Sequence, residues 1–276
     1  MDREDLLFTL RALLHAPDAA AFTAVVRRTP PADIVEALEG ESPQRIAPLL
    51  MLLPPAERTE LFSYLPNELQ DALLPLLPRP AVVALFESLP SDDRADLFNR
   101  LGDAARAQLL PALAKVERDD ILRLAAYPEG SVGSVTTSDY AALGAELGAA
   151  DALQALRASA PDKETIYVLY VLDDERRLLG TVSLRELVLA PPGAKVADLM
   201  QRDPVRARAD WPRAQAAELI RRYDLLALPV TDAAERMIGI VTVDDAMDID
   251  KAADATQLAR FGGTTPLGGP ELDLRA

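Results

Sequence analysis

The sequence predicts a multidomain chain of the α plus α/β class, in which a superhelical α-helical repeat precedes a tandem α+β module and a terminal helix. Three patterns in the 276 residues support this fold class. Leucine, phenylalanine and proline recur every 12 residues in the first half. A strand–turn–strand–helix unit occurs twice in the second half, and its second copy ends in an acidic helix start.

The 12-residue repeat predicts an all-helical domain over residues 1–126. Leucine followed by proline, or once by glycine, recurs at Leu53-Pro54, Leu65-Pro66, Leu77-Pro78, Leu89-Pro90 and Leu101-Gly102. Between these pairs, two apolar residues recur at Leu61-Phe62, Leu73-Leu74, Leu85-Phe86, Leu97-Phe98 and Leu109-Leu110. Proline ends one helix and begins the next, because it lacks an N–H and is tolerated in a first turn. A short helix cannot bury its apolar face alone, so we expect neighbouring helices to stack.

The second half predicts the order β-α-β-β-α twice. Expected strands cover residues 165–172, 177–182, 205–208, 227–230 and 237–243, and expected helices cover 149–160, 183–189 and 212–223. A terminal helix is expected from about Val243, and Gly180 and Gly239 hold equivalent places 59 residues apart. We therefore expect one α+β domain over residues 127–192 and a second over 193–250. Residues 251–276 are expected to continue the terminal helix and then form a linker.

Composition limits the chemistry of this chain. A net charge of −15 argues against binding to nucleic acid or to anionic membrane surfaces. There is no cysteine and only one histidine, His15, so a thiolate or imidazole metal site is excluded and hard oxygen ligands for Mg²⁺ or Ca²⁺ remain. No signal peptide and no apolar run of about 18 residues are present, so we expect a cytoplasmic chain. No catalytic motif is found, which favours a sensor over an enzyme.

Carboxylates gather at the start of the expected terminal helix, at Asp244, Asp245, Asp248 and Asp250. In the helical repeat, Glu60 and Asp96 lie three repeats apart and so share one repeat position. Acidic residues in the first turn of a helix also interact favourably with the helix dipole without any ligand. Both interpretations, a cation site and simple helix-start charges, remain open for these residues.

Several motifs resemble a known family. The segments VLYVLDDERRLLGTVSLREL and LPVTDAAERMIGIVTVDD, with VADLM at residues 196–200, resemble a pair of CBS domains, which together form a Bateman module. The segments LFSYLPNELQDALLPLLPR and LFESLPSDDRADLFNRL resemble the N domain of MgtE-type magnesium channels. The order of helical repeat, CBS pair and acidic terminal helix is similar to the cytosolic part of that family.

The resemblance implies a dimeric Mg²⁺ sensor whose last helix, the plug, leads into a transmembrane pore that this chain does not contain. It places the chain at the inner face of the cell membrane when it is joined to such a pore. The matching metal ligands are Glu60, Asp92 and Asp96 in the helical repeat, and Asp224, Asp245 and Asp248 in the second CBS domain and plug. The family carries further glutamates in the plug, whereas this chain has residues 251–257, KAADATQ, so some ion sites are expected to be missing or weaker.

The resemblance also implies an adenine-nucleotide site. CBS pairs that bind adenine nucleotides use a glycine, a hydroxyl residue and an acid. This pattern matches Gly180, Ser183 and Glu186 in the first unit and Gly239, Thr242 and Asp245 in the second. Relatives that bind ATP in the first unit also use an arginine, which matches Arg185. The aromatic residue of that pattern is replaced by Val168. The alternative is that these residues only form a strand–helix corner.

Three functions stay open at this point: a Mg²⁺-sensing part of a magnesium channel, a freestanding adenine-nucleotide sensor, and a structural interaction module. The CBS pair makes the third the weakest. We expect a homodimer formed through the CBS helices, with an apolar face made by Leu184, Leu187, Val188, Ala246 and Met247.

Overall fold

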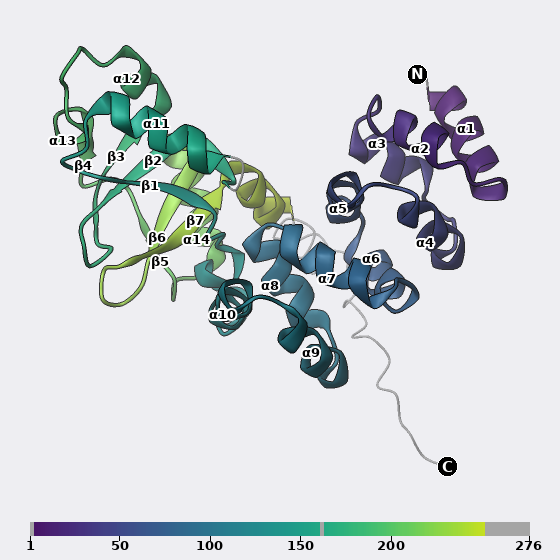
Figure 1. The fold of residues 1–276 in the computed structure, drawn as a ribbon. Helices are drawn as coiled ribbons and strands as arrows, with labels where there is room; N and C mark the ends of the chain where they lie inside the picture. The colour runs from purple at the N-terminus through teal and green to yellow at the C-terminus, as the bar shows by residue number, and fades with distance from the viewer. Residues whose placement is uncertain (1–2, 161–162, 252–276) are drawn as a thin grey trace. The chain divides into compact units, whose positions relative to one another are not determined.

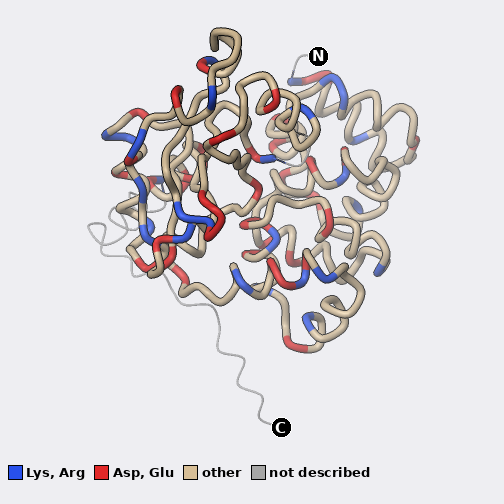
Figure 2. The backbone as a smooth tube through the Cα atoms, turned by 60° about the vertical axis from the view of Figure 1, so that its left-hand side comes forward, with Lys and Arg blue, Asp and Glu red and all other residues tan. Residues whose placement is uncertain are grey.

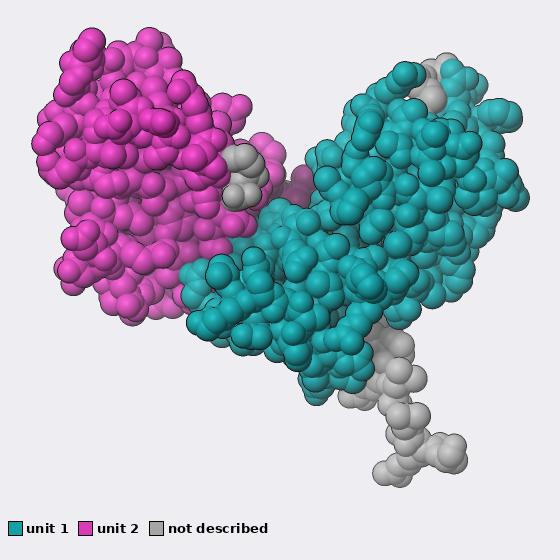
Figure 3. Space-filling model, viewed as in Figure 1, with its two compact units in different colours: residues 1–126 teal, residues 127–276 magenta. Residues whose placement is uncertain are grey.

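The computed structural model describes residues 3–160 and 163–251. The chain divides into two compact units between Ala126 and Tyr127, here called unit 1 and unit 2 (Figure 3). Unit 1 is helical, and unit 2 combines helices with two β-sheets (Figure 1). The predicted fold class is confirmed.

Unit 1 contains helices throughout, and no strand occurs in its described residues, 3–126. The elements are α1 (Arg3–His15), α2 (Ala19–Val26), α3 (Pro31–Ala37), α4 (Pro43–Met51), α5 (Pro55–Ser63), α6 (Asn67–Leu73), η1 (Leu74–Leu76), α7 (Arg79–Ser88), α8 (Ser91–Arg100), α9 (Asp103–Leu109), η2 (Leu110–Ala112) and α10 (Lys115–Leu124). Helices two places apart pack together, as α1 does with α3, α5 with α7 and α8 with α10. This packing is the stack that the 12-residue repeat predicts.

The repeated prolines begin helices, and the repeated apolar pairs fill the core. Pro54, Pro66, Pro78 and Pro90 precede the first residue of a helix, with φ between −48° and −59°. The ring fixes φ in this range, so it favours an abrupt helix start. The leucine and phenylalanine pairs are almost all buried in one continuous apolar core.

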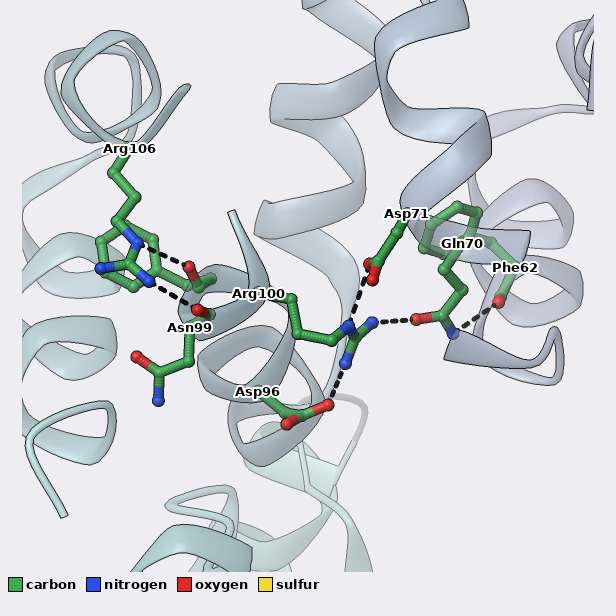
Figure 4. A network of polar contacts seen from close by, with 8 residues as sticks. Phe62, Gln70, Asp71, Asp96, Asn99, Arg100 and Arg106 are labelled. Atoms are coloured by element: carbon green, nitrogen blue, oxygen red, sulfur yellow. Dashed lines mark hydrogen bonds and ion pairs between the residues drawn. The ribbon is translucent and has the colours of Figure 1, made fainter. Parts of the chain in front are cut away.

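A ladder of polar side chains, which we did not predict, joins successive helices of unit 1. Arg58, Gln70 and Arg106 each donate to the carbonyl eight residues earlier, and Arg94 donates to the carbonyl five residues earlier. All four occupy one position of the 12-residue repeat, and Figure 4 shows two of them. The oxygens of Leu50, Phe62 and Phe98 also accept a backbone N–H from three residues later, so these side chains add a second hydrogen bond to carbonyls at helix ends. In the intervening repeat the same position holds Val82.

Unit 2 repeats one motif twice. The elements are η3 (Val132–Val135), β1 (Tyr140–Gly144), α11 (Ala149–Ser159), β2 (Thr165–Leu172), β3 (Leu178–Ser183), α12 (Leu184–Leu189), α13 (Val196–Leu199), β4 (Gln201–Arg202), β5 (Ala207–Arg208), α14 (Arg213–Tyr223), β6 (Ala227–Thr231) and β7 (Met237–Thr242). Residues 243–251 are helical. One sheet has the order β1-β2-β3-β4 and the other β5-β6-β7, each with a parallel first pair and an antiparallel second pair.

Each half of unit 2 completes the sheet of the other half. Strand β4, at the start of the second half, pairs with β3 at Gly180. Thr137, at the start of the first half, exchanges two backbone hydrogen bonds of 2.9 Å with Ile240 of β7. A Cβ at Gly180 would lie 2.7 Å from the Gln201 oxygen, and one at Gly239 would lie 2.2 Å from the Thr137 oxygen. The two equivalent glycines therefore permit close approach of backbones.

The two halves also share turns and a core. Arg176 and Glu235, again 59 residues apart, have φ of 65° and 64° in matching hairpin turns. Asp173 and Asp232 fix these turns by accepting two backbone N–H bonds each. A small core of buried side chains combines both halves, with Tyr140, Tyr170, Ala227, Met237 and Ile240.

Most predicted elements of unit 2 are found. The predicted order implies a strand before α11, but no residue range was predicted for β1. Two further differences concern short strands. The strand predicted over residues 205–208 covers only Ala207–Arg208, and the two-residue strand β4 was not predicted. The terminal helix begins at Val243 as predicted, and its expected continuation and linker, residues 252–276, lie outside the described residues. Among the described helices, none has the length and apolar character needed to cross a membrane.

The glycine contacts give a first prediction. Gly239→Ala should lower the stability of the protein by about 1–3 kcal/mol, because the new Cβ meets the Thr137 backbone and neither strand can move freely. Gly144→Ala is the matched control, since a Cβ there meets nothing within 4 Å and should leave stability unchanged or slightly raised. Thermal unfolding of both variants measures the difference, and equal melting temperatures would contradict the tight contact at Gly239.

Candidate functional site

The first turn of the terminal helix holds the predicted ligand Asp245. The side chain of Asp245 accepts hydrogen bonds from the Thr242 Oγ1 at 2.6 Å and from the Thr242 backbone N–H at 3.4 Å. Thr242 ends strand β7, and Asp245 lies three residues further on. This is the reach-back half of a capping box, in which the third helical residue accepts from the N-cap backbone. Both bonds are made to Oδ2, and none is found to Oδ1 among the described residues.

Asp245 carries its negative charge at an energetic cost. Burial raises its pKa above the ordinary value, and the nearby carboxylates of Asp244 and Asp248 raise it further, while the hydrogen bonds from Thr242 lower it. Asp248 is exposed and forms an ion pair of 2.7 Å with Lys251. A positive ion placed here would favour the charged form of Asp245, because an opposite charge at short range offsets both burial and repulsion.

Asp224, the third predicted ligand of unit 2, has a backbone role. It follows helix α14 with φ of 53°, and its N–H donates to the Ile220 oxygen. Aspartate and asparagine tolerate this left-handed conformation better than most residues, so Asp224 ends the helix. Its side chain is exposed.

The predicted ligands of unit 1 lie on helices α5 and α8. Glu60 is exposed in the second turn of α5, and Asp92 lies in the first turn of α8. Asp96 forms an ion pair with Arg100 one turn later, and Arg100 also binds Asp71 at 2.9 Å and the Gln70 side chain (Figure 4). Asp96 is therefore already held by an internal cation.

The described part of the chain contains no preformed metal centre. Within residues 3–160 and 163–251, no three histidine, cysteine, aspartate or glutamate side chains gather closely enough to hold an ion. Acidic and basic residues are interspersed along the backbone of both units (Figure 2). Mg²⁺ keeps several waters and often binds one or two carboxylates, so it does not need a closed cage of protein ligands. The carboxylates found here suit such hydrated, weak binding.

The predicted nucleotide residues form the equivalent corner in the first half of unit 2. Ser183 and Glu186 make a full capping box, with the Ser183 N–H 2.8 Å from Glu186 Oε2 and the Glu186 N–H 3.1 Å from Ser183 Oγ. Ser183, Arg185 and Glu186 line an open pocket of about 500 Å³ with Leu189, Pro191 and Leu199. Ser183 and Glu186 therefore form a strand–helix corner between β3 and α12, and the pocket beside this corner leaves room for a ligand.

The apolar face expected for dimer contact is only partly exposed. Leu187 and Ala246 are buried in the cores of unit 2, and Leu184 packs against one of them, because each helix turns this side toward its sheet. These residues were assigned to the wrong face. Val188 and Met247 are exposed as predicted, at 61% and 58%, and Leu189 is exposed beside Val188.

The sequence contained signals for features that we missed. Both capping boxes follow the pattern of a hydroxyl residue and then an acid three residues later, S-x-x-E at 183–186 and T-x-x-D at 242–245. Arginine or glutamine at 58, 70, 94 and 106 follows the same 12-residue period as the leucines. Reading polar positions with the apolar period would have identified the ladder.

Comparison with known proteins agrees with this architecture. The family profile of the MgtE intracellular N domain matches residues 29–130, and that of the CBS domain matches residues 132–193 and 196–251. Magnesium transporter MgtE of Thermus thermophilus is 39% identical over 145 residues, which cover 52% of this chain and 32% of that protein. Magnesium transporter MgtE of Bacillus subtilis is 38% identical over 126 residues, which cover 46% and 28%. The chain thus spans no more than about a third of these relatives.

Two solved structures cover nearly the whole described fold. The cytosolic domain of the Mg²⁺ channel MgtE in complex with ATP aligns with a TM-score of 0.83 and 34% identity, covering 88% of this chain and 99% of that one. The soluble part of a magnesium transporter aligns with a TM-score of 0.84 and 26% identity, covering 91% and 99%.

The surroundings of Asp245 give a second prediction. Asp245→Asn keeps an oxygen for the Thr242 bonds and removes the charge, so it should raise stability at neutral pH. Asp245→Ala removes the capping interaction and should lower the free energy of unfolding by about 0.5–2 kcal/mol.

The pH dependence of these variants follows from the raised pKa of Asp245 in the folded state. The folded protein binds the Asp245 proton more tightly than the unfolded chain does, so the parent protein loses stability as the pH rises through that pKa. The advantage of Asp245→Asn should therefore shrink on acidification toward about pH 4. Thermal unfolding at both pH values tests this, and an Asn variant as unstable as the Ala variant would exclude the charge effect.

Proposed function

Because the chain belongs to the MgtE family, as the N domain and CBS pair of its cytosolic part, we propose that it is the Mg²⁺-sensing regulatory part of a magnesium channel or transporter. It performs no catalysis in this proposal. The pore is a transmembrane partner joined to or associated with the chain, and the chain works at the inner face of the membrane. Membership of the family supports the association with a pore at the membrane, and the carboxylates support the sensing of Mg²⁺.

The observation that carries the sensing proposal is the state of Asp245. The folded protein holds this carboxylate half-buried beside two others at a helix start, and its raised pKa reports the resulting cost. A divalent cation relieves that cost wherever it can approach Oδ1. A state of the protein that brings more carboxylates to the same ion binds it more tightly, so Mg²⁺ shifts the population toward that state.

We assign Glu60, Asp92 and Asp96 of unit 1 and Asp224, Asp245 and Asp248 of unit 2 as the carboxylates that Mg²⁺ draws together. Each ion binds one or two of them and keeps its remaining waters. At low Mg²⁺ their mutual repulsion keeps the two units apart, and at high Mg²⁺ the units close. Closure positions the terminal helix so that the pore is shut. Arg100 and Lys251 compete with the ion for Asp96 and Asp248, which makes the response graded and weak.

The chain acts as a homodimer in this proposal. Val188, Leu189 and Met247 are large apolar side chains exposed on helices that follow the last strand of each half. Their burial against a second copy would remove apolar surface from water at about 25 cal/mol per Å². A dimer also places two copies of the terminal helix beside one pore.

An adenine-nucleotide sensor is the second candidate. It is favoured by the pocket lined by Ser183, Arg185 and Glu186, and by the ATP-bound state of one similar structure. Glu186 Oε1 is available to ribose hydroxyls, because only Oε2 takes part in the capping box. ATP can also act together with Mg²⁺, as a second ligand of the same sensor. ATP as the sole effector would change the radius of the protein when Mg²⁺ does not.

Mg²⁺ should compact the chain and raise its melting temperature. Asp245→Asn combined with Asp248→Asn should make the metal-free protein more compact and reduce its response to Mg²⁺, because about 1 kcal/mol of repulsion is removed for each close pair. X-ray scattering during titration with MgCl₂, and separately with ATP, measures the radius.

Two controls make this test specific. Asp174→Asn combined with Glu175→Gln removes the same charge from an exposed hairpin turn and should respond to Mg²⁺ as the parent does. Sodium chloride at matched ionic strength should reproduce only a small part of the effect, since it screens without coordination. A double variant of Asp245 and Asp248 that still compacts fully would reduce these residues to helix-start charges.

The dimer can be tested at its exposed apolar side chains. Val188→Glu should weaken dimerisation by about tenfold or more, because a charge would have to be buried at the contact. Val116→Glu alters an equally exposed valine of unit 1, at 77%, and should leave the dimer intact. Light scattering over a range of protein concentrations in millimolar Mg²⁺ gives the mass. A monomer at every concentration would contradict the proposal.

A further inference from the structure

Unit 1 contains a pocket that the proposed function does not use. It has a volume of about 370 Å³ and lies between η1, α7 and the α8–α9 corner. Its apolar walls include Leu74, Val82, Val83 and Leu109. Its charged lining residues are Arg79, Arg100 and Asp71, and Asp71 is paired with Arg100. Pockets that bind small molecules occupy about 300–1,000 Å³ and are mostly apolar with a few polar groups. This pocket has that size and that composition.

The pocket lies where the 12-residue repeat departs from its own pattern. The ladder position that holds Arg58, Gln70, Arg94 and Arg106 holds Val82 here, so the long polar side chain that spans this space elsewhere is missing. The position that holds proline in four repeats holds Gly102, and a Cβ added to Gly102 would meet nothing within 4 Å. Val82 and Gly102 both line the pocket. We infer that the smaller residues Val82 and Gly102 leave the space that the pocket occupies.

The two arginines of the pocket differ in what they can still bind. Arg100 is already held by Asp71, Asp96 and Gln70, so it stiffens the wall and offers no unbalanced charge (Figure 4). Arg79 is exposed, and its one hydrogen bond among the described residues runs from Nη2 to the Gln108 backbone oxygen at 3.1 Å. Within the described residues Arg79 forms no ion pair. The rim therefore carries a cation without a counter-charge beside an apolar cavity.

We propose that this pocket binds a small amphiphilic anion, with its apolar body between Val82, Val83 and Leu109 and its anionic head at Arg79. Charge complementarity selects the anion, since the guanidinium of Arg79 pairs well with a carboxylate. Burial of the apolar body supplies most of the affinity. The site lies in unit 1 alone, and its lining contains none of the assigned Mg²⁺ ligands. Its one link to them is Arg100, which pairs with Asp96, so binding at Arg79 goes beyond the proposed function.

Sodium octanoate and octanol are the probes, because they share an apolar chain and differ in charge. Calorimetric titration of the full chain should show saturable octanoate binding with a dissociation constant below about 1 mM. Backbone amide shifts should locate it at η1, α7 and α9. Arg79→Gln should weaken octanoate binding by about fivefold and leave octanol unchanged. Arg11→Gln removes an exposed arginine of α1 and is the matched control.

Two variants that restore the repeat test the pocket itself. Val82→Arg introduces an arginine at the ladder position and should abolish binding of both probes, because its side chain fills the pocket. Val116→Arg, at an exposed residue of α10, should leave binding unchanged. Gly102→Pro should narrow the pocket and still fold, because φ at Gly102 is −69° and Leu101 is already extended. The proposal is overturned if octanoate shows no saturable binding, or if folded Val82→Arg and Gly102→Pro proteins bind it as the parent does.

Discussion

Unit 2 depends on two places where backbones meet without a side chain between them. Gly180 contacts the segment of Gln201, and Gly239 contacts that of Thr137, so each half completes its sheet with a strand or bridge from the other half. Three residues after each glycine the strand ends in Ser183 or Thr242, whose partners Glu186 and Asp245 begin the next helix. The position of both candidate sites is therefore set by the backbone contact. Neither half can move its acidic corner without disturbing the edge that it shares with the other.

The acidic residues serve local structure first, and any ligand must use what is left. Glu186 and Asp245 each commit one oxygen to a helix start, Asp224 holds a left-handed helix end, and Asp96 is paired with Arg100. A carboxylate that is already hydrogen-bonded is oriented before an ion arrives, which lowers the entropic cost of binding. The same hydrogen bonds lower the affinity of the carboxylate for a cation, because they already stabilise part of its negative charge. We therefore expect these carboxylates to bind Mg²⁺ weakly, since the ion keeps several waters and takes only one or two carboxylates.

Periodic signals predicted the fold well, and contacts between distant segments were not predictable. The 12-residue leucine period predicted the helices of unit 1, and runs of β-branched and other apolar residues predicted β2, β3, β6 and β7. Strand β4 has only two residues and therefore shows no periodic pattern in the sequence. It forms by pairing with β3 at Gly180, where the lack of a side chain permits the close approach. The burial of Leu187 and Ala246 was missed because the six residues of α12 and the first turns of the terminal helix offer too few apolar positions to distinguish a buried side from an exposed one. Among the predicted site residues, residue type and position were found, while partners such as Arg100 and Thr242 depend on tertiary packing.

A repeat also provides its own reference for what each position contributes. Where Arg58 or Arg106 stands, the side chain fills the space between two helices and donates to carbonyls at the end of the earlier one. Val82 does neither, yet α7 still packs against α5 and its core residues stay buried. The helical stack therefore tolerates the loss of one polar side chain of the ladder, because the apolar core of unit 1 is continuous. Stability of this layer leaves single positions such as 82 and 102 free to differ, and it is at such positions that a repeated scaffold can form a pocket.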